Sequence, residues 1–117
     1  MENSILTSVK KLLGIAEDYT EFDMDIIIHI NSVFVTLQQL GVGPEEGFSI
    51  SDSSTTWSSY LNNDKLLNNV ISYMGLRVKM LFDPPTNSSI LSSYERTIQE
   101  LEWRINVMVD PKEATSG

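Results

Sequence analysis

Residues 65–109 read KLLNNVISYMGLRVKMLFDPPTNSSILSSYERTIQELEWRINVMV and contain two apolar stripes, separated by Asp83-Pro84-Pro85. In each stripe the apolar residues recur at steps of three and four, which places them on one face of an α-helix. The first stripe is Leu66, Leu67, Val70, Ile71, Met74, Val78, Leu81 and Phe82, and the second is Tyr94, Ile98, Leu101, Ile105 and Met108. Proline fixes its own φ and lacks an N–H, so the tandem prolines end the first helix near Phe82 or Asp83. Side-chain oxygens in residues 86–89 can cap the second helix. We therefore predict an antiparallel helical hairpin with a rigid corner.

The residues before this hairpin predict two further helices, over about 4–13 and 23–40. Asn3 or Ser4 can cap the first, and Gly14 suits the left-handed position that ends a helix. Asp23 is a good N-cap for the second, with Phe22 placed to pack onto its first turn. Three consecutive isoleucines in this segment also suit a buried strand, but about five turns of helical period favour a helix in which Ile28 points away from the buried stripe. Together with helices over 64–82 and 88–109, these segments predict an all-α, small four-helix bundle.

The segment from residue 41 to residue 63 lacks this periodicity and is rich in Ser and Thr. Its Gly41-Val42-Gly43-Pro44 start is typical of a turn, and Phe48-Ser49-Ile50 could form a short strand. The segment cannot bury much apolar area by itself, yet its large apolar side chains are costly to leave in water. We therefore expect four of its residues to lie at an interface between subunits: Phe48, Ile50, Trp57 and Tyr60.

Length and composition predict one domain, over 1–109, followed by a flexible C-terminal tail over 110–117. The chain has no cysteine, so thiolate metal sites and disulfides are excluded. Its first residues lack the basic and apolar pattern of a signal peptide, and no stretch approaches the ~18–20 apolar residues that cross a bilayer. The formal net charge of −8 repels phosphate, which argues against sequence-independent binding of DNA.

No pattern in the chain predicts catalysis, a cofactor or a metal. His29 is the only histidine and has no nucleophile in a recognisable motif beside it. The acidic residues Asp18, Glu21, Asp23 and Asp25 lack the glycine and terminal glutamate of a calcium loop, and acids at a helix N-terminus are also favoured by the helix dipole. Gly41-Val42-Gly43 lacks the third glycine and the Lys-Ser/Thr pair of a phosphate-binding loop. We expect a protein that is not an enzyme.

Trp103 falls outside the stripe of the last predicted helix. A tryptophan at such a position either completes the edge of the core or anchors an interface, and Ile28, Ile90 and Val107 raise the same question. The stripe itself continues to Met108 and Val109, beyond the reach of a short partner such as the first helix.

Several stretches, in this order and spacing, resemble the head–tail connector (adaptor) proteins of long-tailed bacteriophages and prophages of Gram-positive bacteria. They are Ser8-Val9-Lys10-Lys11-Leu12-Leu13-Gly14-Ile15, Phe22-Asp23 with Asp25 to Ser32, Gln39-Leu40-Gly41-Val42-Gly43-Pro44, Gly47-Phe48-Ser49-Ile50, Thr56-Trp57, Leu81-Phe82-Asp83-Pro84-Pro85 and Glu100-Leu101-Glu102-Trp103-Arg104-Ile105-Asn106. The resemblance implies a structural, all-α protomer of a ring, commonly a dodecamer, below the portal protein. Such a ring extends the DNA channel without sequence-specific binding and presents a surface to a downstream stopper or tail-completion protein. It implies a place in the neck of the virion, after assembly in the host cytoplasm, and no catalytic residues.

In the family that the chain resembles, the C-terminal region commonly reaches the portal. The residues that would make this contact are Trp103, Arg104, Asn106, Val107, Asp110 and Lys112. Two alternatives remain open at this stage. A stopper or tail-completion protein would be rich in β-structure, and a DNA-packaging protein such as a small terminase subunit would carry a basic helix-turn-helix.

Overall fold

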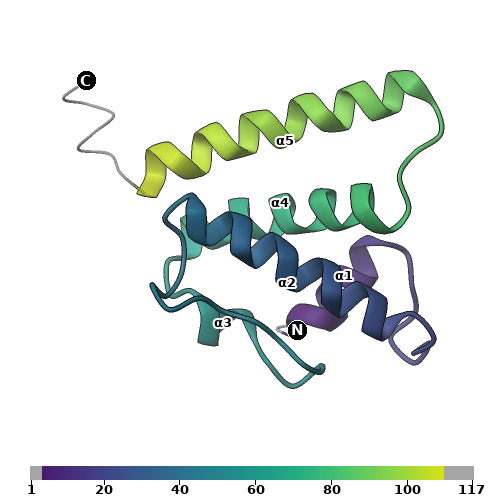
Figure 1. The fold of residues 1–117 in the computed structure, drawn as a ribbon, viewed down its shortest axis with the longest axis horizontal. Coiled ribbons are helices and arrows are strands. Elements are labelled where there is room, and N and C mark those ends of the chain that lie inside the picture. Colours follow the sequence, from purple (N-terminus) through teal and green to yellow (C-terminus); the bar gives the residue numbers. More distant parts are fainter. Residues whose placement is uncertain (1–3, 110–117) are drawn as a thin grey trace.

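The computed structural model describes residues 4–109, and this part of the chain is a bundle of α-helices (Figure 1). The helices are α1 (Ile5–Leu12), α2 (Asp23–Gln39), α3 (Trp57–Tyr60), α4 (Asp64–Phe82) and α5 (Ser88–Val109). The all-α prediction is confirmed, and the four predicted helices agree with α1, α2, α4 and α5 to within one residue at each end. Periodicity did not predict α3, because a single turn is too short to show a stripe.

Side chains cap four helices at their N-termini, and at α3 the cap is Thr56 Oγ1, which accepts from the N–H of Ser59 at 3.3 Å. Ser4 Oγ accepts a hydrogen bond from the N–H of Thr7 at 3.2 Å, and Asn63 Oδ1 caps α4 in the same way. At α5, Asn87 Oδ1 accepts from the N–H groups of Ser89 and Ile90. These bonds satisfy amides that have no partner within the helix.

The predicted N-cap of α2 is wrong. Asp23 is the first residue of the helix, and Phe22 occupies the cap position without a capping side chain. The Asp23 carboxylate instead lies 2.9 Å from Nζ of Lys10, which also donates to the carbonyl oxygen of Glu17. A nearly buried cation needs a partner more than a helix end does, because an unpaired charge is costly away from water.

Glycines end α1 and α2 as the sequence predicts. Gly14 and Gly41 have φ of 81° and 90°, a region that only glycine enters without strain. In both cases the following residue bonds back to the last turn: the N–H of Val42 lies 2.9 Å from the carbonyl oxygen of Leu37. Each chain reversal is therefore fixed by backbone hydrogen bonds.

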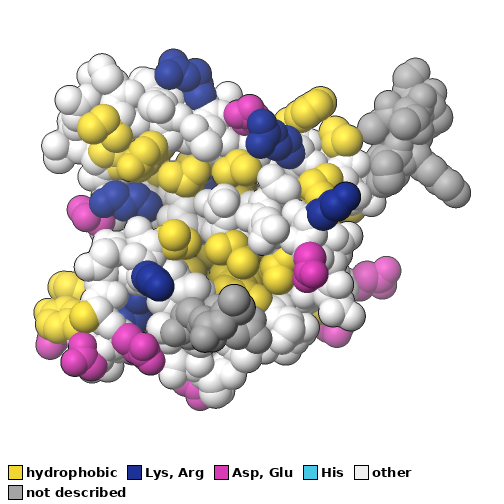
Figure 2. All heavy atoms as spheres, turned by 180° about the vertical axis from the view of Figure 1, so that it is seen from behind, with side chains coloured by type: hydrophobic (Ala, Val, Ile, Leu, Met, Phe, Trp, Pro, Cys, Tyr) yellow, Lys and Arg dark blue, Asp and Glu magenta, His cyan; other side chains and the backbone are white. Residues whose placement is uncertain are grey.

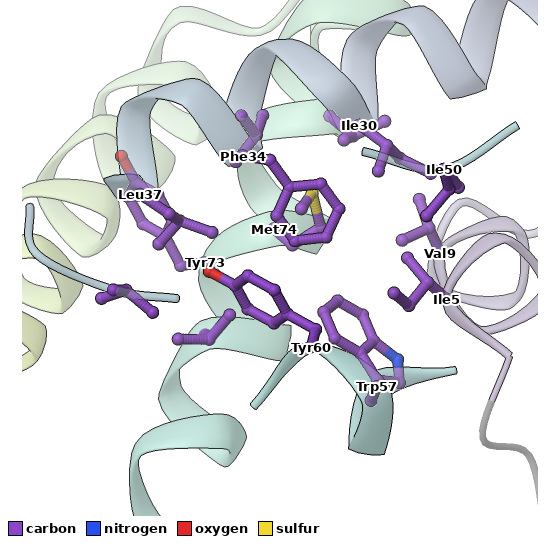
Figure 3. Packing of buried hydrophobic residues seen from close by; sticks show 14 of the residues in the cluster. Ile5, Val9, Ile30, Phe34, Leu37, Ile50, Trp57, Tyr60, Tyr73 and Met74 are labelled. Carbon is purple, nitrogen blue, oxygen red and sulfur yellow. The ribbon is translucent and has the colours of Figure 1, made fainter. Parts of the chain in front are cut away.

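The α4–α5 hairpin turns at Pro84-Pro85, and its two helices run antiparallel side by side (Figure 1). Helix α4 is the centre of the bundle, because it packs against α5, α2 and α1. Figure 3 shows where the layers meet, with Met74 of α4 facing Phe34 and Ile30 of α2. The fully buried residues include Ile5, Val9, Ile26, Ile30, Leu37, Val70, Tyr73, Met74, Val78 and Ile105.

The segment from residue 41 to residue 63 closes the core on the side away from α5 (Figure 1), and its aromatic rings pack on Phe34 of the buried side of α2. The predicted strand at Phe48-Ser49-Ile50 is wrong: residues 47–50 have no regular secondary structure and pair with no strand in the described chain. Both backbone groups of Ile50 are bonded by the side-chain amide of Asn31, at 2.8 and 3.0 Å. One side chain therefore replaces the strand that Ile50 would otherwise need.

Within residues 4–109 no helix combines the length and the apolar character that crossing a membrane requires.

Candidate protein-interaction surfaces

The described residues hold no group of three potential metal ligands of the His, Cys, Asp or Glu type. Of the predicted acidic group, Asp23 pairs with Lys10, while Asp18, Glu21 and Asp25 point to solvent. His29 is partly buried, with its ring 6.4 Å from that of Phe82. Nothing in this arrangement positions a nucleophile or a base, so surfaces are the candidates for function.

Four of the six predicted portal-contact residues lie in the last two turns of α5. Trp103 is 67% exposed, so it is not an edge of the core. Val107, one turn later, is partly exposed; Asn106 is exposed, and Arg104 forms an exposed ion pair with Glu100 at 3.1 Å. The other two residues, Asp110 and Lys112, lie outside the described chain. The outer side of α5 therefore presents a large aromatic side chain beside a charged pair.

The prediction that the apolar stripe at the end of α5 has no covering partner is wrong. Met108 and Val109 are partly buried and pack against the core. Asn69 of α4 donates to Sδ of Met108 at 3.4 Å, and a Cβ on Gly41 would lie 3.0 Å from a methyl carbon of Val109. The turn after α2 and the start of α4 cover this end, which a stripe on one helix cannot reveal.

The four residues expected at a subunit interface lie in or against the core of their own chain. Ile50, Trp57 and Tyr60 are buried, and Phe48 is partly buried. Phe48, Trp57 and Tyr60 surround Phe34 of α2, whose ring centroid lies 4.6 Å from that of Tyr60 and 5.1 Å from that of Phe48. The segment does bury its own apolar side chains, contrary to expectation, so they need no neighbouring subunit to leave water. A contact of this segment with a second subunit stays a prediction.

Helix α2 carries an exposed apolar row. Of its residues, the sequence predicts only Ile28 to point away from the buried stripe. Met24, Ile28 and Val35 are 71%, 59% and 54% exposed. They are separated by four and seven residues, one and two helical turns, and so lie on one side of α2. The helical spacing of these three residues is visible in the sequence. The same helix also has a longer apolar stripe that is buried, so spacing alone does not show that the shorter row is exposed.

A protein-family model with the description "phage connector protein" matches residues 5–112, which include all five helices. The chain belongs to the phage connector protein family. Searches of curated proteins and of solved structures each returned no match. This family is structural, in keeping with the predicted absence of catalysis.

The hairpin of this connector is tied by polar side-chain contacts in addition to its apolar stripe, among them the bond from Asn69 to Met108. The Tyr73 hydroxyl of α4 donates to Oε2 of Glu102 on α5 at 2.7 Å. Arg77 stacks over the Tyr73 ring, with its guanidinium carbon 5.7 Å from the centroid. Burial, then the bond to Glu102, raises the pKa of Tyr73 above its ordinary value, so the hydroxyl keeps its proton.

A groove of about 500 Å³ lies beside this contact, between α4 and α5. Its walls are Arg77, Met80, Leu81, Glu95, Ile98, Gln99 and Glu102. The mixed polar and apolar walls do not favour any one chemical class of ligand.

Proposed function

We propose that this connector is a subunit of a ring at the head–tail junction of a tailed bacteriophage, below the portal protein. The ring extends the channel through which DNA leaves the head, and its other side receives a downstream stopper or tail-completion protein. The observation that carries this proposal is the family match over residues 5–112. The earlier resemblance in the sequence points to the same role.

Features of the protomer support it. Two helices, α2 and α5, keep large apolar side chains in water, and exposed apolar patches commonly mark contact surfaces. The net charge of −8 suits a wall past which DNA must slide, since an acidic surface repels phosphate.

The alternatives lack such support. A stopper or tail-completion protein of the β-rich type does not fit a chain whose described residues form helices and one isolated bridge. A DNA-packaging protein needs a basic surface, and eight basic residues stand against sixteen acidic ones here.

Electron microscopy of negatively stained particles tests the ring. The purified protein is imaged alone and after mixing with the portal protein of the same phage. We expect ring-shaped particles with rotational symmetry, coaxial with the portal in the mixture. Particles without symmetry in both samples would contradict the proposal.

We further propose that the end of α5 docks on the portal, with Trp103 and Arg104 as its anchors. Tryptophan and arginine are the residues most often found at energetic centres of interfaces, and both are exposed here. Trp103→Ala and truncation after Val109 should each leave the helical circular dichroism nearly unchanged and weaken portal binding.

The matched control is Ile90→Ala, which removes an apolar side chain, 46% exposed, from the opposite end of α5. It should bind the portal like the parent. Equal binding by the parent, Trp103→Ala and the truncated chain would exclude this docking role, as would loss of the fold in Trp103→Ala.

A further inference from the structure

Helix α2 has two apolar sides, and only one of them is used within the chain. The buried side includes Ile26, Ile30, Phe34 and Leu37. The other side carries the row Met24, Ile28 and Val35, which we call the α2 row. It runs along about 16 Å of helix. Three large apolar side chains, each more than half exposed, are costly to leave in water at one place.

The surroundings of the α2 row are acidic. Glu21 and Asp25 are exposed near its N-terminal end, and Glu45 and Glu46 are exposed near the C-terminal end of the helix, where Gln38 bonds the Glu45 carbonyl. Residues 4–63 contain eight acidic and two basic residues, whereas residues 64–109 contain five of each. The charge of the chain is thus concentrated in the half that carries α2.

The opposite side of the molecule offers a complementary surface. Helices α1 and α4 lie behind α2 in Figure 1, and Figure 2 shows this side with both basic and acidic side chains around apolar areas. Leu12 of α1, 57% exposed, lies over Gly75 of α4, where a Cβ would come within 2.7 Å of it. Leu67 and Ile71, two turns and one turn before Gly75, are partly buried and continue this apolar row.

Two lysines near that row in the sequence have no competing ion-pair partners in the described chain: Lys11 precedes Leu12, and Lys65 lies in the first turn of α4. Lys11 and Lys65 are exposed, and neither forms an ion pair within residues 4–109. We call Lys11, Leu12, Lys65, Leu67 and Ile71 the α1–α4 face. Its apolar centre and basic flanks match the apolar centre and acidic flanks of the α2 row.

We propose that the α2 row of one subunit docks on the α1–α4 face of a second copy of the same chain. Two different surfaces of each copy are then used, which is a head-to-tail contact, and such contacts close into rings when the rotation permits. The inference rests on the proposed ring and names the surfaces that would build it.

A symmetric contact between two α2 rows is disfavoured by charge. The row has carboxylates at both ends, and the one lysine next to the start of α2, Lys10, is buried against Asp23. Either a parallel or an antiparallel pair of α2 rows would therefore bring acid against acid.

The first test removes the apolar contact. Ile28→Gln keeps a good helix former at an exposed site, so the fold should persist, and circular dichroism checks it. Sedimentation velocity of the full chain over a concentration series should show self-association weakened about tenfold or more. The matched control, Ile90→Gln on α5, should associate like the parent. Unchanged self-association of Ile28→Gln would overturn the inference.

The second test exchanges charges. Together, Glu21→Lys, Asp25→Lys, Glu45→Lys and Glu46→Lys make the surroundings of the α2 row basic, and Lys11→Glu with Lys65→Glu makes the α1–α4 face acidic. Each set alone should weaken assembly, whereas a chain with all six changes should assemble again, because opposite charges face each other once more. A contact between two α2 rows predicts no effect of the lysine pair alone and no rescue in the combined chain, and that result would overturn the inference.

The two proposals fail in different ways. If the parent forms rings with or without the portal and the α2 variants form them equally well, only the present inference falls. If the parent forms no symmetric assembly alone or on the portal, the proposed ring falls and takes this inference with it. If Ile28→Gln loses portal binding but keeps its self-association, the α2 row serves another partner and the inference is wrong.

Discussion

The α4–α5 hairpin and the segment from residue 41 to residue 63 bury apolar side chains in different ways. The hairpin aligns its stripe by backbone periodicity and adds side-chain bonds such as those from Tyr73 to Glu102 and from Asn69 to Met108. The segment has one turn of helix and is held by bonds from distant elements. The Trp57 indole N–H donates to Ser8 Oγ at 2.7 Å, and the N–H of Ile5 donates to the carbonyl oxygen of Thr55 at 3.0 Å.

This difference shows that burial does not require regular structure, provided that the polar backbone groups find partners. In the hairpin the helix supplies those partners automatically. In the segment, individual side chains such as Asn31 supply them one at a time. The hairpin should therefore be sensitive to core polarity, and the segment to the loss of single anchors.

The largest effect should come from a charge in the hairpin core. Met74 is fully buried, so Met74→Asp would bury an unpaired carboxylate. We expect a loss of ~5 kcal/mol or more, comparable to the whole stability of a domain of this size, so that the protomer unfolds. Thermal unfolding followed by circular dichroism measures it. Leu81→Asp, at a site on α4 that is 48% exposed, is the control and should keep the fold. An unchanged melting temperature in Met74→Asp would refute the core assignment.

The next effect should come from the anchor of the segment. Trp57→Ala should cost about 3–5 kcal/mol, because a buried aromatic side chain and its bond to Ser8 are lost together. The other tryptophan gives the control: Trp103→Ala, at a site 67% exposed, should cost less than ~1 kcal/mol. Urea unfolding of both variants makes the comparison. Similar losses in the two would mean that the segment does not depend on Trp57.

A smaller effect should separate two buried tyrosines. The Tyr73 hydroxyl bonds Glu102, whereas the Tyr60 hydroxyl is buried without a hydrogen-bond partner in residues 4–109. Tyr73→Phe should cost about 1.5 kcal/mol, and Tyr60→Phe should be neutral or slightly stabilising. Urea unfolding at neutral pH tests this. A larger cost for Tyr60→Phe than for Tyr73→Phe would be inconsistent with this view of the core.

The same tyrosines predict how stability responds to alkaline pH. Burial raises the pKa of both above the ordinary tyrosine value of about 10. Above that pH the unfolded chain releases protons that the folded chain retains, so the unfolded state binds fewer protons and the free energy of unfolding falls as pH rises. Below about pH 10 the stabilisation is fully present. The chain with both Tyr→Phe changes should show a flatter dependence, measured by urea unfolding between neutral and alkaline pH. An equally steep fall would show that other groups cause it.

The smallest effect should be found where α1 crosses α4. Gly75→Ala gains helix propensity of ~1 kcal/mol but moves Leu12, whose methyl carbon would lie 2.7 Å from the new Cβ. The two contributions should nearly cancel. In a Leu12→Ala background only the gain remains, so Gly75→Ala should stabilise that chain by roughly 0.5–1 kcal/mol. A double-mutant cycle of thermal unfolding measures this, and equal effects in both backgrounds would exclude the contact.

The sequence predicted those parts of the fold that depend on local chemistry. The stripes located four helices, glycine ended α1 and α2, and the tandem prolines ended α4 at Phe82. Asp23 shows where local chemistry is insufficient. Capping preferences favour it as an N-cap, but its carboxylate forms an ion pair with Lys10, 13 residues earlier in the chain.

For the surfaces, the sequence identified Trp103 as a residue outside its stripe, and its exposure confirms that position. It did not predict that Phe48, Ile50, Trp57 and Tyr60 pack in or against their own core, because large apolar residues in a segment without period can cover either their own core or a neighbour; their contact with a second subunit stays a prediction. It predicted that Ile28 points away from the core but did not predict the exposure of Met24 and Val35, since the longer stripe of the same helix is the buried one. Which side of a doubly apolar helix lies inside depends on contacts that no local pattern contains.

The bond from Trp57 to Ser8 joins residues that are 49 positions apart, and it has a consequence for the order of folding. Closing so long a loop costs more chain entropy than closing the α4–α5 hairpin, whose bond from Tyr73 to Glu102 joins residues 29 positions apart, so we expect the hairpin to form first. Helix α1 is synthesised first but can be secured only after residue 57 has left the ribosome. Its docking therefore comes late, and substitutions at Ser8 or Trp57 should accelerate unfolding while changing the folding rate little.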